Sequence, residues 1–226
     1  MELKNFGQNI YHVDIPFQLL NIHIGNRMSV ILLQDGKVWV HSPITPHQDL
    51  VDHLNQLGEV SYVIAPNQFH HVHLPNFHSH FPEAKYFATL GLPHKRSGFA
   101  FDVEMQVDQS FPWKEEIESL MLDGMPKVNE WVYLHKPSKT LIVTDLLFHF
   151  VDFPNWRTSW FAKLNRSHNK PHWSWFYFLN ISDRKAFSQS LQKLEHWDFD
   201  KVLLSHGAPI YENAKERVMQ GLRKII

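Results

Sequence analysis

Three apolar segments of this chain lead directly into side chains that can bind a metal ion. Residues 60–65 are followed by His70 and His71, residues 140–144 by Asp145, and residues 201–204 by His206. The segments are short and rich in β-branched residues, which predicts buried β-strands. Because open α/β sheets place their sites at the ends of strands, we expect these four side chains to meet at one edge of an α/β core.

The rest of the chain alternates between strand and helix signals. Further strands are expected at residues 10–14, 28–33, 37–41, 85–88 and 130–135, and helices at about 46–57, 75–81, 182–197 and 213–226. Gln34-Asp35-Gly36 predicts a hairpin turn, and Ser182 is the expected N-cap of its helix. The sequence contains no linker, repeat or low-complexity tract, and its length suits one large core. We therefore expect a single domain over residues 1–226.

Residues 149–176 form a tryptophan-rich segment, which we expect to be an insertion over one end of the domain. It contains Trp156, Trp160, Trp173 and Trp175 among several basic side chains. As a lid, the segment would create an aromatic pocket, with Trp156 and Trp160 as the candidates to contact a substrate. As a cap, it would instead cover a sheet edge or form the contact of a homodimer.

Composition narrows the chemistry of the chain. There is no cysteine, so a transition metal must be held by imidazole and carboxylate. The formal net charge of -1 argues against nucleic acid or an anionic membrane as a partner. No stretch reaches the roughly 20 apolar residues of a membrane span, and the first residues lack the apolar core of a secretory signal. We therefore expect a cytoplasmic protein that acts on a small molecule.

Each candidate ligand also has an ordinary structural explanation. Asp145 could cap the turn after its strand, and His206 could be fixed by a tight turn at Gly207. The pair His70-His71 could lie in a solvated loop, because imidazole is common at half-buried positions. An acid directly after an apolar strand is nevertheless costly to bury unless a cation or several donors pair with it, which favours a metal.

The order and spacing of these segments resemble the metallo-β-lactamase superfamily, a group of metal-dependent hydrolases. Residues 144–148, TDLLF, resemble its GD-x-L-F segment, and residues 204–210, LSHGAPI, resemble its terminal GHG-x-P-(I/V) segment. The resemblance spans nearly the whole chain. It implies an α/β fold of the four-layer αββα type, with two mixed β-sheets facing each other and helices outside. It also implies one metal ion held by His70, His71, Asp145 and His206, with Asp145 as a ligand or the catalytic proton acceptor.

The chain departs from the superfamily pattern at the second metal position. The T-H-x-H-x-D-H signature falls on residues 65–71, APNQFHH, and the G-H-T segment falls near Met125 without a histidine. The residues that stand in place of expected ligands are Pro66, Gln68, His70 and, after an early strand, Ser42. The chain most resembles a divergent branch with V-H-S-P, A-P-N-x-x-H-H and S-x-T-L-I-V-T-D segments and a reduced metal site. Asn67, Gln68 and His41 are the expected supporting residues.

A mononuclear site suggests several functions. Three imidazoles and a carboxylate suit one zinc ion, with iron as the alternative. If the metal keeps an open position, a water molecule bound there becomes acidic enough to attack an ester, thioester, lactone or phosphoester. We therefore expect a metal-dependent hydrolase. A degenerate domain that has no metal and binds a ligand or partner without catalysis is the main alternative, and a metal-dependent oxidoreductase is a further one.

Overall fold

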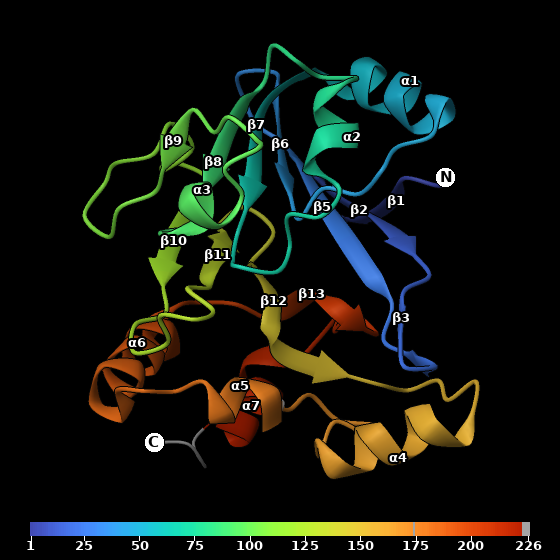
Figure 1. Ribbon diagram of the computed structural model, residues 1–226, viewed down its shortest axis with the longest axis vertical. Helices are drawn as coiled ribbons and strands as arrows, with labels where there is room; N and C mark the ends of the chain where they lie inside the picture. Colours follow the sequence, from blue (N-terminus) through green and yellow to red (C-terminus); the bar gives the residue numbers. More distant parts are fainter. Residues whose placement is uncertain (174, 223–226) are drawn as a thin grey trace.

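The computed structural model describes residues 1–173 and 175–222, and two β-sheets form its centre (Figure 1). The first sheet has the order β1-β2-β5-β6-β7-β8-β9. Its strands are β1 (Lys4–Gly7), β2 (Ile10–Ile15), β5 (Asn26–Leu32), β6 (Lys37–His41), β7 (Glu59–Ala65), β8 (Lys85–Ala88) and β9 (Val103–Glu104). The second sheet consists of β10 (Ile117–Met121), β11 (Trp131–His135), β12 (Thr140–His149) and β13 (Lys201–Gly207). A short ribbon of β3 (Gln18–Leu19) and β4 (Ile22–His23) connects β2 to β5.

Both sheets are mixed and face each other. In the first sheet, the pairs β1–β2, β2–β5 and β5–β6 are antiparallel, and the pairs β6–β7, β7–β8 and β8–β9 are parallel. In the second sheet, β12 and β13 form the parallel pair. Side chains alternate along the strands: Trp39 and Ile64 of the first sheet share a core with Ile142 and Leu203 of the second. The neighbouring positions point to the outer faces, which pack against helices.

Helices cover the two outer faces. Against the first sheet lie α1 (Gln48–Leu57), α2 (Leu74–His78) and α3 (Leu92–Lys95). Against the second lie α5 (Trp175–Leu179), α6 (Arg184–His196) and α7 (Ala214–Leu222). The expected αββα sandwich is therefore confirmed. In the described part of the chain, no helix combines the length and apolar character needed to cross a bilayer.

The tryptophan-rich segment includes α4 (Trp156–Leu164), which lies beside the β3–β4 ribbon (Figure 1). Asn155 caps this helix by accepting from the Thr158 backbone N–H, and its side-chain amide donates to the carbonyl oxygen of Asn21. The Thr158 hydroxyl accepts from the backbone N–H of His23. These bonds tie two segments together that are more than 130 residues apart in the sequence.

Several element boundaries differ from the sequence prediction. β12 continues past Thr144 to His149, because most of the residues after Asp145 are apolar and all of them stay buried. β13 extends to Gly207. Asp183, and not Ser182, caps α6 by accepting from the Ala186 N–H, while the Ser182 hydroxyl donates to the Gly124 carbonyl oxygen. α1 begins at Gln48 and α2 at Leu74. The last four residues of the expected C-terminal helix lie outside the described residues.

Candidate metal centre

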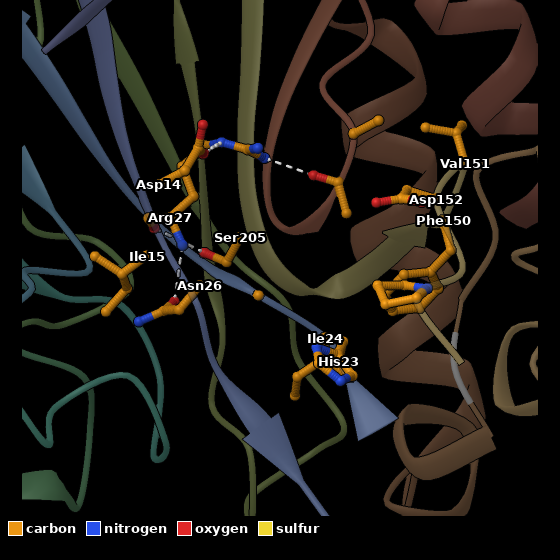
Figure 2. A pocket seen from close by; sticks show the side chains of 14 residues that line it. Asp14, Ile15, His23, Ile24, Asn26, Arg27, Phe150, Val151, Asp152 and Ser205 are labelled. Atoms are coloured by element: carbon orange, nitrogen blue, oxygen red, sulfur yellow. Dashed lines mark hydrogen bonds and ion pairs between the residues drawn. The ribbon is translucent and has the colours of Figure 1, made fainter. Parts of the chain in front are cut away.

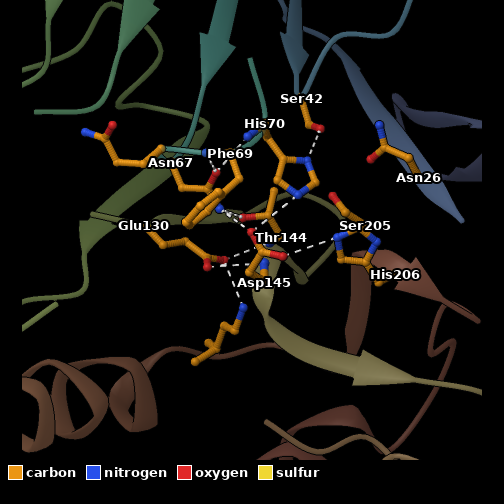
Figure 3. A network of polar contacts seen from close by, with 12 residues as sticks. Asn26, Ser42, Asn67, Phe69, His70, Glu130, Thr144, Asp145, Ser205 and His206 are labelled. Carbon is orange, nitrogen blue, oxygen red and sulfur yellow. Dashed lines mark hydrogen bonds and ion pairs between the residues drawn. The ribbon is translucent and has the colours of Figure 1, made fainter. Parts of the chain in front are cut away.

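His70, Asp145 and His206 meet from three different segments of the chain (Figure 3). His70 lies in the loop after β7, whereas Asp145 and His206 lie within β12 and β13. Asp145 Oδ2 is 3.4 Å from His70 Nε2, and Asp145 Oδ1 is 3.2 Å from His206 Nε2. The ligand atoms of a tetrahedral zinc ion with bonds of 2.0 to 2.1 Å would lie about 3.3 Å apart. Each imidazole nitrogen lies at about this distance from one of the two carboxylate oxygens, and one ligand atom from each residue lies within 4.8 Å of the other two, which is close enough for the three side chains to share a metal ion.

The two imidazole rings are each held by their other nitrogen. His206 Nδ1 donates to the Gly25 carbonyl oxygen at 2.8 Å, and His70 Nδ1 lies 2.7 Å from the Ser42 hydroxyl oxygen. Because a carbonyl oxygen only accepts, the proton of a neutral His206 ring is on Nδ1, and Nε2 presents a lone pair to Asp145. A lone pair facing a carboxylate at 3.2 Å requires a cation or an additional proton between them. The donor set therefore fits a divalent metal.

Asp145 is buried and is connected to the loop that carries His70. The Asn67 side-chain amide donates to Asp145 Oδ2 at 2.7 Å and to the Thr144 hydroxyl at 2.9 Å. Its carbonyl oxygen accepts from the backbone N–H groups of Phe69 and His70. Burial alone would raise the pKa of Asp145, but the neighbouring His70 and His206 hold that pKa well below its usual range. Asp145 therefore carries the negative charge that a cation would balance.

A second buried carboxylate, Glu130, supports the backbone at Asp145 (Figure 3). Between the pairs Val143–Leu204 and Phe148–His206 the register of β12 and β13 shifts, so the intervening N–H groups of β12 need other acceptors. Glu130 accepts from Thr144 and Leu146 through Oε1, at 2.8 and 3.3 Å, and from Asp145 through Oε2, at 3.2 Å. Burial, and then the charge of Asp145, raise the pKa of Glu130 to about 7.

Arg27 of β5 holds the segment that carries His206 (Figure 2). Its Nη1 donates to the carbonyl oxygens of Leu204 and Gly207, which flank the histidine. Its Nε donates to Asp14 Oδ1 at 2.6 Å. Arg27 and Asp14 line a cavity of about 290 Å³. Together with the Gly25 carbonyl, Arg27 joins the first sheet to the strand of the second sheet that bears the candidate ligand.

A larger cavity of about 570 Å³ lies beside the three converging side chains, all of which line it. Apolar side chains of the β3–β4 ribbon, Leu19 and Ile22, form part of its wall, and Phe148 of β12 and Phe161 of α4 form another part. The candidate centre is therefore accessible to a small molecule from an apolar space.

His71 does not join the other three expected ligands. Its Nδ1 lies 3.3 Å from Nη1 of Arg96, and burial, followed by the charge of Arg96, lowers the pKa of His71 to about 4. It still lines the larger cavity. The bonds of Asn67 to the backbone of Phe69 and His70 fix a turn that directs His70 toward Asp145, and the next side chain points elsewhere. The predicted four-residue convergence is thus reduced to three residues.

The remaining predicted residues include three that are buried near the candidate centre. Asn67 contacts Asp145 directly, whereas the Gln68 amide donates to the Leu90 carbonyl oxygen. His41 is fully buried and stacks on Trp39, and burial, then the charge of His70, holds its pKa well below the usual value. Among residues 1–173 and 175–222, neither ring nitrogen of His41 has a hydrogen-bond partner.

The two tryptophans proposed to contact a substrate lie at the surface. Trp156 and Trp160 are 72% and 61% exposed and are not among the described residues that line the larger cavity. The residue of α4 that lines it is Phe161. Sequence reasoning also missed Glu130 and Arg27 as supporting residues. The only available signal was a charged residue at the start of an apolar strand in each case.

Solved structures with the same architecture define the class of fold. A metallo-β-lactamase from Pontibacter korlensis matches with a TM-score of 0.66 and 13% identity over 98% of both chains. One from Hirschia baltica matches with a TM-score of 0.67 and 10% identity over 99% of this chain and 96% of that one. A metal-soaked Flv1 flavodiiron core from Synechocystis sp. PCC6803 matches with a TM-score of 0.66 and 12% identity, over 99% of this chain and 60% of that one. The protein has a metallo-β-lactamase-like fold.

The sequence itself places the chain in a family. Residues 7–159 match the family model described as "Domain of unknown function (DUF4336)", which covers well over half of the chain. The protein belongs to this family. No curated protein sequence matches the chain.

Proposed function

We propose that this protein is a mononuclear metal-dependent hydrolase that acts on an ester, thioester, lactone or phosphoester. The observation that carries the proposal is the convergence of His70, Asp145 and His206 at the wall of a cavity large enough for a small molecule. A buried carboxylate that faces two imidazole nitrogens, whose other nitrogens are already engaged, is an arrangement that a bound cation would stabilise.

The separation of His71 from the group supports a catalytic site over a structural one. Structural zinc sites have four protein ligands, whereas catalytic sites have three and leave one position for water or substrate. Two imidazoles and one carboxylate suit zinc, with iron as the alternative. A divalent ion held by these residues would polarise a carbonyl or phosphoryl oxygen and lower the pKa of a water molecule. Asp145 would act as a ligand or would accept the proton of that water.

Metal analysis combined with activity assays tests the proposal. We expect about one equivalent of zinc or iron in the purified protein, and hydrolysis of at least one substrate in an ester, thioester, lactone and phosphodiester panel. Chelator should abolish the activity, and added metal should restore it. His206→Ala should lose the metal and at least a hundredfold in activity.

His71→Ala is the matched control, because His71 lines the same cavity but lies outside the converging group. This variant should keep its metal. Chelator should also lower the melting temperature of the wild type but not that of His206→Ala, since metal binding adds to the free energy of unfolding. Protein that contains no metal as isolated and hydrolyses nothing in the panel, even with added metal, would contradict the proposal.

A second candidate function is a non-catalytic domain that binds a ligand or partner. The replacement of the second metal position by Pro66, Gln68 and Met125 favours it. In that case Asp145 would pair with protonated His70 or His206, both within 3.4 Å. The melting temperature would then depend on pH but would be the same with and without chelator. The absence of a chelator effect would distinguish this function from the first.

A further inference from the structure

Most of the residues that line the larger cavity are apolar. Its polar lining residues are the three of the centre together with Asn26, Ser42, His71 and His73. The rest of the wall is aliphatic or aromatic, with Leu19 and Ile22 contributed by the β3–β4 ribbon. A substrate would therefore place its reactive group beside His70 and Asp145 and its other part against apolar side chains.

The apolar wall reaches the surface of the molecule. Phe17 and Leu19, next to and within β3, line the cavity although 44% and 58% of their surfaces are exposed. Phe148 and Phe161 line it from β12 and α4 and pack against each other, with ring centroids 6.2 Å apart. Exposed apolar side chains that continue into a cavity are typical of a site that binds an apolar ligand.

The charges around the cavity narrow the class of ligand further. Among the described residues that line it there is no lysine or arginine. Two cations of the described residues contact lining residues from outside the cavity: Lys95, which lies over the Phe69 ring and donates to the Gln68 carbonyl oxygen, and Arg96, which contacts His71. A carboxylate or phosphate on the non-reacting part of a substrate would lose its water without gaining a lysine or arginine partner among the described lining residues.

We propose that the substrate is an uncharged carboxylic ester or lactone with an apolar acyl or aromatic group. This inference rests on the hydrolase function proposed above. In the reaction, the hydroxyl of water bonds to the acyl carbon, the ester C–O bond breaks, and the remaining proton of water goes to the leaving alkoxide oxygen. The products are a carboxylic acid and an alcohol, or, from a lactone, one hydroxy acid.

Matched p-nitrophenyl substrates test the preference. They are the acetate, butyrate and octanoate esters, the monoester of succinic acid, which resembles butyrate with a terminal carboxylate, and bis(p-nitrophenyl) phosphate. We expect kcat/KM to rise at least tenfold from acetate to octanoate and to fall at least tenfold from butyrate to the succinate monoester. Equal rates with butyrate and the succinate monoester, or a preference for the phosphodiester, would overturn the inference.

Three substitutions in or next to the β3–β4 ribbon test where the acyl group binds. Ile22→Asp places a charge in the cavity wall, and it should lower kcat/KM for octanoate at least tenfold more than kcat/KM for acetate. Leu20→Asp is the control, because Leu20 is 80% exposed and is not among the described lining residues. Ile22→Leu should keep the wild-type preference. An unchanged preference in Ile22→Asp, with both variants folded by circular dichroism, would place the acyl group elsewhere and refute the assignment.

Binding of an unreactive ketone separates this inference from the hydrolase proposal. If no ester in the panel is hydrolysed, the hydrolase proposal fails. Calorimetric titration of 2-octanone into chelator-treated protein then tests whether the cavity binds an apolar ligand. Binding that is weakened at least tenfold by Ile22→Asp and unchanged by Leu20→Asp supports an apolar ligand site. An absence of binding to the wild type overturns it.

Discussion

At the scale of single residues, the candidate centre depends on side chains that orient the imidazoles. His70 and His206 have their Nδ1 atoms beside Ser42 and the Gly25 carbonyl oxygen, which leaves Nε2 of each ring facing Asp145. Partners of this kind fix the orientation of a metal-binding ring and are worth 10- to 100-fold in metal affinity. Ser42, which the sequence showed only as a replacement for an expected ligand, therefore orients one of the candidate ligands.

Ser42→Ala should weaken zinc binding about 10- to 100-fold, because His70 loses the partner of its Nδ1. Titration with a competing chelator measures the affinity. Thr45→Val is the matched control: Thr45 makes the same contact, at 2.9 Å, with His73, which lies outside the converging group. Equal loss in both variants would mean that Ser42 acts on the fold of the loop and not on the metal.

The sequence predicted the three converging residues because each follows or interrupts an apolar strand. It could not predict that His71 points away, since the direction of neighbouring side chains in a loop depends on backbone bonds such as those of Asn67. Similarly, the composition of residues 149–176 suggested that Trp156 and Trp160 contact a substrate. Which face of α4 meets the cavity depends on its packing beside the β3–β4 ribbon, and this contact is not encoded locally.

At the scale of secondary-structure elements, the irregular pairing of β12 and β13 positions Asp145. The strand boundaries predicted from apolar runs were correct at the start of β12 but ended it too early, because an acid was taken as the sign that the strand leaves the core. In the structure β12 continues past Asp145, and Glu130 accepts hydrogen bonds from the backbone N–H groups of β12 that β13 leaves unpaired. A buried acid that accepts from the backbone of another strand has no recognisable sequence pattern.

Glu130→Gln should lower the free energy of unfolding by about 1 to 3 kcal/mol, because the amide NH₂ cannot accept from the backbone of β12 and buried donors are left unpaired. Urea unfolding at pH 7.5 measures the change. Glu83→Gln is the control, since Glu83 is exposed in the turn before β8 and the substitution makes the same chemical change in solvent. Equal stability of the two variants would show that Glu130 is not needed to hold the irregular strand.

At the scale of the whole molecule, buried histidines connect stability to pH. The fold holds His41 and His135 in their neutral forms: burial keeps the pKa of His41 well below its usual value and lowers that of His135 to about 4. In the unfolded chain both rings take up protons near pH 6.5. Their contribution to stability is therefore complete above pH 6.5 and is lost as the pH falls below it. Glu130, whose pKa is raised to about 7, acts in the opposite direction over part of this range.

Comparison of the wild type with His41→Phe isolates one of these contributions. Phe should fit against Trp39 and Tyr133 without a buried polar atom, so the variant should be at least as stable at pH 7.5. As the pH falls from 7 to 5, the variant should lose less stability than the wild type, by roughly 1 kcal/mol or more. Urea unfolding at each pH gives the difference. Parallel pH profiles would mean that folding leaves the pKa of His41 unchanged, and would contradict this account.

The candidate ligands are divided between the two halves of the sandwich. His70 follows a strand of the first sheet, whereas Asp145 and His206 belong to the second. During folding, each sheet can form its own hydrogen bonds before the other is present, but the centre is complete only after the sheets have docked. A bound ion would therefore cross-link the two sheets. Because the ion binds only after the sheets have docked, it would slow unfolding and leave the folding rate nearly unchanged. The metal would thus add kinetic stability to the native state.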